Sequence, residues 1–237
     1  MVRIGKLLAL FSMLLLAAAS LAHAETDAEG WRLSMDSDNV KVWKRAEAGS
    51  DFVSFRAETT IHTSLSGLLA LFYDLDAAPQ WLDHTSRVVA LQRDDVKHSY
   101  VMLIETEMPW PLKNRDAVIA GHWWQDPASH VIYMRGKATP KGSFPENPAF
   151  QRYYDLRNDW TFIPQPNGNV RVIMEGHADP AGNLPAWAVN LLIQQSPFKT
   201  LQNMRSVVAQ ERYQKAHLQD VNVVQEPGVA TLAQAAP

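Results

Sequence analysis

The sequence predicts an α+β fold in which a curved antiparallel β-sheet wraps around one long C-terminal helix. Three observations lead to this fold class. Most of the middle of the chain alternates apolar and polar residues with a period of two, as half-buried antiparallel strands do. Helical spacing replaces this alternation in one short early region and in one long region near the end. Strands segregated from their helices in this way indicate an α+β domain.

The first 24 residues are predicted to be a secretory signal peptide that lies outside the fold. Arg3 and Lys6 precede a continuous apolar run, and Ala22 and Ala24 place small residues at the recognition positions of a cleavage site. The run is shorter than the roughly 20 residues that a membrane-spanning helix needs, although an uncleaved anchor remains the alternative. We therefore expect export, with the periplasm of a Gram-negative bacterium as the destination.

The predicted strands cover most of the middle of the chain, and turn residues separate them. Their spans are 39–47, 52–63, a strand beginning near 87, 99–107, 116–124, 130–138, 152–163 and 169–179. Because side chains alternate between the two faces of a strand, each strand also predicts which of its residues face the helix. The inward sets include Tyr100, Met102 and Ile104 on one strand, and Tyr154 and Asn158 on another.

The predicted helices begin and end at characteristic residues. Ser64 is the expected N-cap of the first helix, and Pro79 is expected to end it before a second short helix. The long helix should run from residue 186 to about 218, with a kink at Pro197. The small, mostly uncharged residues of 220–237 are expected to form a disordered tail, which leaves 25–219 as one domain.

Composition excludes several classes of function. Without Arg3 and Lys6 the 22 basic residues become 20 against 25 acidic ones, a net charge of −5, so no general affinity for nucleic acid is expected. The chain has no cysteine, which excludes thiol catalysis and cysteine metal sites. Neither an HExxH nor a GxSxG motif is present. We therefore expect no metal site, no cofactor and no catalytic residues.

A long sheet wrapped around a single helix encloses more space than the helix can fill. Bulky side chains must occupy the remainder, or a cavity remains. The chain has eight tryptophans and eight methionines, several of them on the predicted inward faces. Flexible thioethers suit a surface that adapts to an apolar guest, whereas an ordinary packed core is the alternative interpretation.

Two motifs resemble the START (StAR-related lipid-transfer) domain family, within the helix-grip superfamily. The segment MPWPLKNRD at 108–116 is similar to the Pro-aromatic-Pro…NRD segment between the fifth and sixth strands of phosphatidylcholine-transfer-like members. The segment GNLPAWAVNLLIQQSPFKTLQNM at 182–204 is similar to the G-x-[IL]-P-x-W-x-x-N entry to the last helix of the family. The order of elements also matches, from residue 25 to about residue 218.

The resemblance implies a helix-grip (START-like) fold with an internal hydrophobic tunnel, one bound lipid or other apolar molecule, and no catalysis. It implies a lid made of the last helix and the 107–113 loop, which includes Met108, Pro109, Trp110 and Pro111. The arginine of NRD holds the head group in phosphatidylcholine-binding members, a role that would fall to Arg115. Met108 departs from the aromatic expected at its position. Sterol binding is not implied, because no arginine stands near Gly121.

The expected ligand contacts combine these faces with the last helix: Arg115, Tyr100, Met102, Ile104, Trp123, Tyr154, Asn158, Met174, Trp187, Leu191 and Met204. For Arg115 the alternative is a structural ion pair with Asp116 or another acid. For Asn158 it is a buried amide whose hydrogen bonds are all satisfied.

Three hypotheses follow for the function. The first is binding, and transfer, of a lipid or other apolar small molecule, with transient membrane contact. The second is a helix-grip cyclase or hydrolase, which would need an acid, base or nucleophile inside the cavity. The third is an envelope-interaction module with a filled core.

Overall fold

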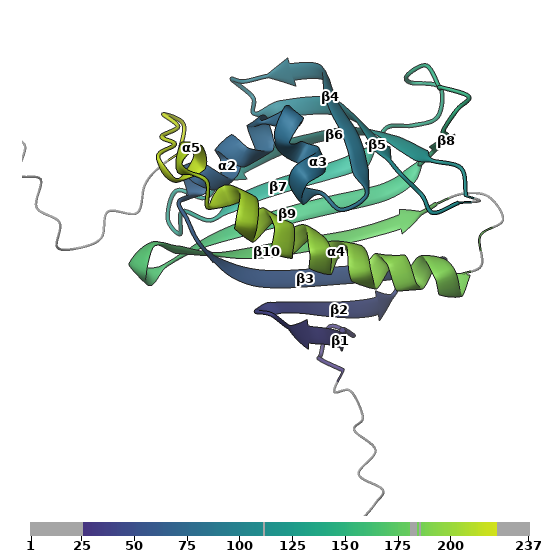
Figure 1. Cartoon of the computed structure of the whole chain (residues 1–237), viewed down its shortest axis with the longest axis horizontal. Helices are drawn as coiled ribbons and strands as arrows, with labels where there is room; N and C mark the ends of the chain where they lie inside the picture. The colour runs from purple at the N-terminus through teal and green to yellow at the C-terminus, as the bar shows by residue number, and fades with distance from the viewer. Residues whose placement is uncertain (1–25, 111, 181–183, 185, 222–237) are drawn as a thin grey trace, which may run out of the picture.

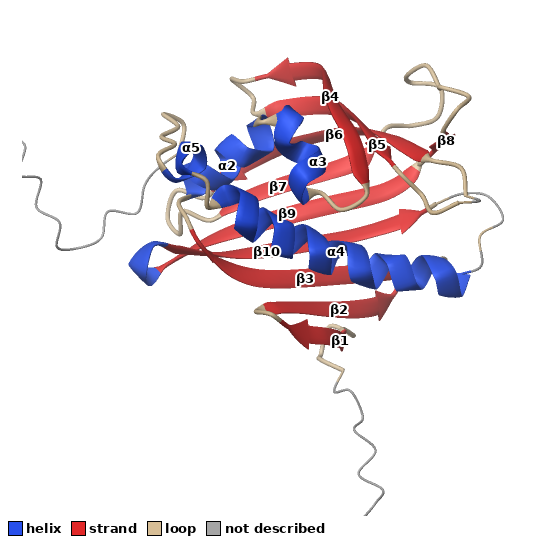
Figure 2. Cartoon of the chain, in the orientation of Figure 1, coloured by secondary structure: helices blue, strands red, loops and turns tan. Residues whose placement is uncertain are grey.

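The computed structural model describes residues 26–110, 112–180, 184 and 186–221. Its strands form one curved sheet in the order β1-β2-β3-β10-β9-β7-β6-β5-β4, with the short β8 added beside β6 (Figures 1 and 2). All pairings are antiparallel except that of β8 with β6. The predicted fold class is confirmed.

The strands of the described residues are β1 (Arg32–Ser37), β2 (Val40–Ala46), β3 (Val53–His62), β4 (Thr85–Asp94), β5 (Ser99–Thr106), β6 (Arg115–Gln125), β7 (Ile132–Ala138), β8 (Gln151–Arg152), β9 (Asp155–Gln165) and β10 (Asn169–Asp179). The helices are α2 (Leu65–Tyr73), η1 (Leu75–Ala77), α3 (Ala78–Trp81), η2 (Pro166–Gly168), α4 (Ala186–Val208) and α5 (Glu211–Gln214).

The concave face of the sheet is covered by two groups of helices (Figure 2). Helix α4 crosses β2 and β3, and α2 and α3 cover the half of the sheet nearer β4. Between them lies a core in which Leu68, Leu69 and Leu201 are fully buried. Each such side chain contributes about 1.5–3 kcal/mol relative to an exposed position.

An aromatic cluster joins α2 and α3 to the sheet. The ring of Phe72 lies 4.9 Å from that of Trp81, 5.1 Å from that of Trp160 and 5.5 Å from that of Phe162. The tilted and edge-on arrangements suit the quadrupoles of these rings. Ser64 caps α2 as predicted, because its Oγ accepts a hydrogen bond from the Gly67 N–H at 2.9 Å.

Four expectations about the elements need correction. Strand β1 was not predicted, because it is an edge strand with most of its residues exposed and so shows little alternation. Pro79 lies in the first turn of α3, where proline is tolerated, and α2 has already ended at Tyr73. Helix α4 ends at Val208, ten residues before the predicted end, since Gln210 is extended. The ninth strand begins at Asp155 and not at residue 152.

The chain after α4 folds back onto the domain. Tyr213 of α5 is buried, and its hydroxyl donates a 2.8 Å hydrogen bond to the Asp74 carboxylate at the end of α2. Val221 is only 5% exposed and belongs to the core, so the domain extends beyond the predicted boundary at residue 219. The predicted signal peptide and the tail from 222 onward lie outside the described residues. None of the helices in the described part is long and apolar enough to cross a bilayer.

Candidate ligand-binding site

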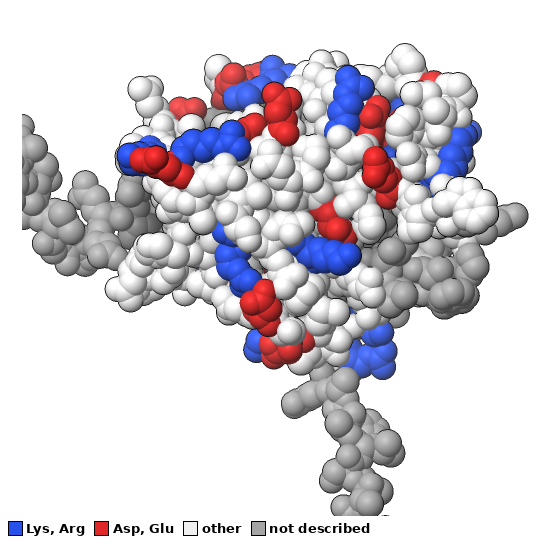
Figure 3. Space-filling view, in the orientation of Figure 1, with Lys and Arg blue, Asp and Glu red and all other residues white. Residues whose placement is uncertain are grey.

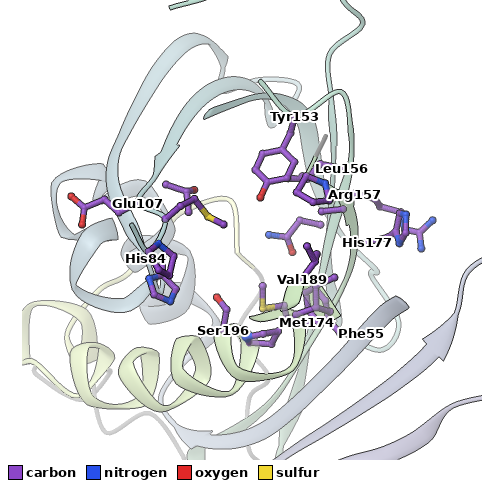
Figure 4. A pocket seen from close by; sticks show the side chains of 18 residues that line it. Phe55, His84, Glu107, Tyr153, Leu156, Arg157, Met174, His177, Val189 and Ser196 are labelled. Atoms are coloured by element: carbon purple, nitrogen blue, oxygen red, sulfur yellow. The ribbon is translucent and has the colours of Figure 1, made fainter. Parts of the chain in front are cut away.

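A cavity of about 200 Å³ lies between the sheet and the first half of α4. Its walls come from β3, β5, β9, β10, α4 and the segment after β5 (Figure 4). The lining is mainly apolar: Phe55, His84, Thr106, Glu107, Met108, Pro109, Tyr153, Leu156, Arg157, Asn158, Met174, His177, Ala178, Pro180, Val189, Ile193, Ser196 and Pro197. We call this the outer cavity. In Figure 4 the charged end of Glu107 and the ring of His177 point away from the hollow.

A second cavity of about 90 Å³ lies deeper, between the sheet and the helices α2 and α3. We call it the inner cavity. Its lining is almost wholly apolar and aromatic: Phe72, Tyr73, Leu75, Ala78, Trp81, Leu82, Val88, Tyr100, Met102, Ile104, Ile119, Trp123, Met134, Gly136, Asn158 and Trp160.

Asn158 on β9 lines both cavities and therefore stands at their junction. Its Oδ1 atom is buried and has no hydrogen-bond partner among the described residues. A buried carbonyl without a partner costs about 1–3 kcal/mol. This is the kind of group that a ligand bearing an N–H or O–H donor can satisfy.

Tyr100 forms part of the inner wall because a glycine on the next strand makes room for it. A Cβ atom added to Gly121, which pairs with Tyr100 across β5 and β6, would lie 2.6 Å from the Tyr100 hydroxyl oxygen and 2.5 Å from the backbone oxygen of Arg135. The ring therefore lies close against the sheet at a position where a side chain does not fit. Burial raises the pKa of the Tyr100 hydroxyl, which stays protonated at neutral pH.

Two more phenols beside the cavities, Tyr73 and Tyr153, are also held in their neutral form. The Trp123 indole N–H donates a 2.9 Å hydrogen bond to the Tyr73 hydroxyl, and burial raises the pKa of Tyr73. Burial likewise raises the pKa of Tyr153, although the nearby Arg115 guanidinium acts in the opposite direction. The polar surface of the inner cavity thus consists of phenols, indoles and an amide, whereas the outer cavity also has His84, Thr106, Glu107, Arg157, His177 and Ser196 in its lining.

Arg115 begins β6 and is 4% exposed. One of its terminal nitrogens donates to the backbone oxygen of Lys113, and its Nε has no hydrogen-bond partner in the described part of the chain. It does not line either cavity, but its charge acts on Tyr153, which does. The alternative of an ion pair between Arg115 and Asp116 is not found, because Asp116 pairs with Arg152.

Asp116 instead pairs with Arg152 of β8. Two Arg152 nitrogens donate to the two carboxylate oxygens at 2.7 Å, and a further bond of 3.2 Å reaches the backbone oxygen of Pro145. Both side chains are buried. This bidentate pair fastens the 140–150 segment and β8 to the start of β6.

The structure brings most of the sequence-predicted residues together. Tyr100, Met102, Ile104 and Trp123 line the inner cavity, Met174 lines the outer one, and Asn158 lines both. Met204 does not line either cavity, because it is fully buried in the core. The side chains of Trp187 and Leu191 lie outside the described residues.

Tyr154 needs a correction by one residue. Because β9 begins at Asp155, the inward alternation does not extend back to Tyr154, whose hydroxyl donates outward to the Glu146 carboxylate. Its neighbour Tyr153 lines the outer cavity instead.

The predicted lid residues separate into two groups. Met108 and Pro109 line the outer cavity, whereas the Trp110 side chain is 93% exposed. Pro111 lies outside the described residues. The Met108 N–H donates a 3.0 Å hydrogen bond to the Asn114 side-chain oxygen, which joins the start of the loop to the residue after its end.

Several lining residues were missed by the sequence analysis. Val189, Ile193 and Pro197 repeat every four residues along α4, a helical spacing that was present in the sequence but was not selected. His84 precedes β4, where no periodicity marks it. Among the described residues, no three histidine, aspartate or glutamate side chains are grouped as metal ligands.

Comparison with known proteins gives consistent matches. A family model described as the START domain matches residues 13–213. An uncharacterized protein of Pseudomonas aeruginosa is 28% identical over 195 residues, which is 82% of this chain and 95% of that protein. The phosphatidylcholine transfer protein of Bos taurus is 22% identical over 179 residues, 73% of this chain and 82% of that protein.

Solved structures agree with these matches. A STAR-related lipid transfer protein from Xanthomonas axonopodis (fragment 25–204) is 28% identical with a TM-score of 0.70, covering 76% of this chain and 99% of that one. Human StAR-related lipid transfer protein 5 is 17% identical with a TM-score of 0.67, covering 84% of this chain and 92% of that one, a likeness that shows the fold alone.

Proposed function

This chain belongs to the START domain family, and from that premise we propose that it binds a lipid, or another apolar small molecule with a polar end, between the sheet and α4. The observation that carries the proposal is the pair of apolar cavities on either side of Asn158, whose buried Oδ1 has no partner among the described residues. Each buried methylene of an acyl chain contributes about 0.8 kcal/mol, so a long chain supplies ample affinity.

The ligand-bound state requires the two cavities to open into one. Their volumes of about 200 and 90 Å³ are below the roughly 300–1,000 Å³ of most small-molecule sites. The wall that they share contains Asn158, and the outer cavity is bounded by Met108, Pro109 and the α4 residues Val189 and Ile193. We assign the lid to these two segments, whose outward displacement would admit the ligand.

Binding without catalysis fits the polar groups that are present. The polar groups of the inner cavity are phenols, indoles and an amide, which lack the nucleophile or the ionised acid–base pair that hydrolysis or cyclisation needs. Arg115 supports the same proposal. Its buried guanidinium acts on the pKa of Tyr153, which lines the outer cavity, and in the ligand-bound state it would bind a phosphate or carboxylate of the ligand.

The direct test is to purify the protein from its native host and to identify bound molecules by native mass spectrometry with organic extraction. We expect about one lipid-sized apolar molecule per chain. Protein that carries none, and takes up none from a total lipid extract of the host, would contradict the proposal. Fractionation of the same cells tests the proposed export to the periplasm.

We expect Asn158→Leu to show two effects of the unpartnered amide: it lowers the stability of the ligand-free protein, and it strengthens lipid binding. Without ligand the variant should be as stable as the wild type or more stable, by up to about 1–3 kcal/mol, because a buried unsatisfied oxygen is removed. Lipid uptake should fall roughly tenfold or more, because the ligand loses its hydrogen-bond acceptor. Thermal melts with and without lipid measure both quantities. Met102→Leu, which leaves the polar groups unchanged, is the control, and equal uptake by both variants would exclude the contact.

Trp110 is proposed as a membrane contact, because this exposed indole follows two residues that line the outer cavity. Tryptophan partitions readily into the interface of a bilayer. Trp110→Ala should lower binding to lipid vesicles roughly tenfold while the content of bound lipid is retained. Trp124→Ala is the matched control, because Trp124 is 40% exposed on the other face of the sheet. Equal losses in a flotation assay would contradict the assignment.

A further inference from the structure

A groove of about 450 Å³, separate from both cavities, lies where the edge strands β1 and β2 meet the first half of α4. Arg32 of β1, Lys44 of β2, and Asn190 and Gln194 of α4 are among the residues that line it. We call it the edge groove. Figure 3 shows basic atoms over this end of β2, at the lower right, without acidic atoms beside them in that view.

The two cations of the edge groove lie directly opposite each other. Arg32 and Lys44 are partners in the register of β1 with β2, so their side chains share a face of the sheet. Lys44 alternates with the fully buried Val40 and Val42, which places it on the concave face. Like charges directly opposite on neighbouring strands repel each other. Neither cation forms an ion pair with any described residue.

The neighbouring amides also present donors to the edge groove. Asn190 Oδ1 accepts the Val53 N–H at 3.1 Å, which leaves the NH₂ group of Asn190 as the available end. Gln194 Oε1 is bonded to the Ser34 hydroxyl at 2.6 Å. Arg45 also borders the groove, but its guanidinium lies over the Trp31 ring at 4.3 Å, so it is not one of the two cations assigned to the anion. Two cations and neighbouring amide donors, with no Asp or Glu among the described residues that line the groove, suit an anion.

The edge groove lies at the same end of the molecule as the segments to which the lid is assigned. β2 ends, α4 begins and β8 lies at the same end of the sheet, on the right in Figure 1. β8 pairs with Arg115 and Asp116, which begin β6 shortly after the lid loop. Along α4, Asn190 and Gln194 line the edge groove whereas Val189 and Ile193 line the outer cavity. An anion in the groove would therefore lie within about one helix diameter, roughly 10–12 Å, of the lipid cavity.

We propose that the edge groove is the docking site for an anionic phospholipid surface, with a head-group phosphate held between Arg32 and Lys44. The inference rests on the proposed function, because a protein that exchanges lipid must bring its cavity entrance to a membrane. The chain is acidic overall, so an anionic bilayer repels most of its surface and attracts this groove. The attraction would orient α4 and the lid loop toward the lipids.

The test measures co-sedimentation of the full-length mature protein with vesicles of phosphatidylcholine alone and with added phosphatidylglycerol. The wild type should bind the anionic vesicles more tightly, with the difference lost at high salt. The double variant R32Q/K44Q should bind them roughly 30-fold more weakly, because each basic residue near an anionic surface contributes about fivefold. The control K97Q/K215Q makes the same change in net charge on exposed cations of the β4–β5 turn and of the segment after α5.

Three outcomes would overturn the proposal. R32Q/K44Q could bind as well as the wild type, or K97Q/K215Q could lose as much affinity, which would assign the effect to net charge. Inorganic phosphate could shift the NMR signals of the groove while the anionic vesicles give no binding. The groove would then be a site for a soluble anion. Bound-lipid content by mass spectrometry is measured in parallel. An R32Q/K44Q variant that keeps its bound lipid but no longer binds the vesicles supports the docking site. A wild-type protein without bound lipid counts against the proposed function instead.

Discussion

Arg152→Ala is expected to lower the free energy of unfolding by about 3–5 kcal/mol, the usual cost of leaving one member of a buried ion pair uncompensated. Arg152 and Asp116 are 6% and 3% exposed, and the two 2.7 Å bonds between them satisfy both carboxylate oxygens. After the substitution the Asp116 carboxylate remains buried, and no second ion pair with a described residue holds it. Urea denaturation measures the change, with an unchanged denaturant dependence as the sign of an intact fold.

Two further variants make this expectation specific. Lys97→Ala removes one partner of the exposed pair with Asp94 and should alter stability by less than about 1 kcal/mol. The double variant Asp116→Leu/Arg152→Met should recover much of the loss, because neither buried charge is then left alone. A single Arg152→Ala variant within 1 kcal/mol of the wild type would show that water or another group compensates Asp116.

Ala178→Trp is expected to weaken lipid binding strongly while the fold is retained. Ala178 lines the outer cavity from β10, so an indole at this position would occupy space that the ligand needs. The cost in stability should be at the low end of the roughly 1–3 kcal/mol typical of overpacking, since the ring enters an existing cavity. Bound lipid per chain, measured after purification from the host, should fall at least roughly tenfold, which is about 1.4 kcal/mol of binding free energy.

The matched control is Thr161→Trp on β9, whose side chain faces away from the helices. Thr161 alternates with the inward residues Trp160 and Phe162 and pairs with Ile173. This variant adds the same ring to the same sheet and should keep its lipid. If Ala178→Trp retained the same lipid in the same amount, the outer cavity would not be the binding site.

Periodicity was sufficient to predict most of the sheet. The strands β2, β3, β7, β9 and β10 alternate between more buried and less buried residues, so burial itself produces the alternation that is visible in the sequence. Strand β1 has mostly exposed residues at the edge of the sheet and therefore carries no such pattern. The end of α4 was misjudged because residues 209–218 keep helical composition, although the chain turns back at Gln210 so that Tyr213 can reach Asp74.

The inward set of residues was predictable where strand boundaries were right. Tyr100, Met102, Ile104 and Trp123 line a cavity because they share parity on β5 and β6, which begin within one residue of the predicted positions. The alternation was extended past the true start of β9, so that Tyr154 was chosen in place of Tyr153. Whether each of these residues contacts a ligand stays a prediction.

The sequence by itself determined the fold class, the family and the approximate faces of the strands, because these depend on local periodicity and on two motifs. Only the tertiary structure decided which acid pairs with which base and where space remains. Asp116 lies next to Arg115 in the chain, yet it pairs with Arg152, 36 residues away, which β8 brings beside β6. The same holds for the edge groove. Arg32 and Lys44 become opposed only when β1 pairs with β2, and α4 closes the groove from more than 140 positions further along the chain.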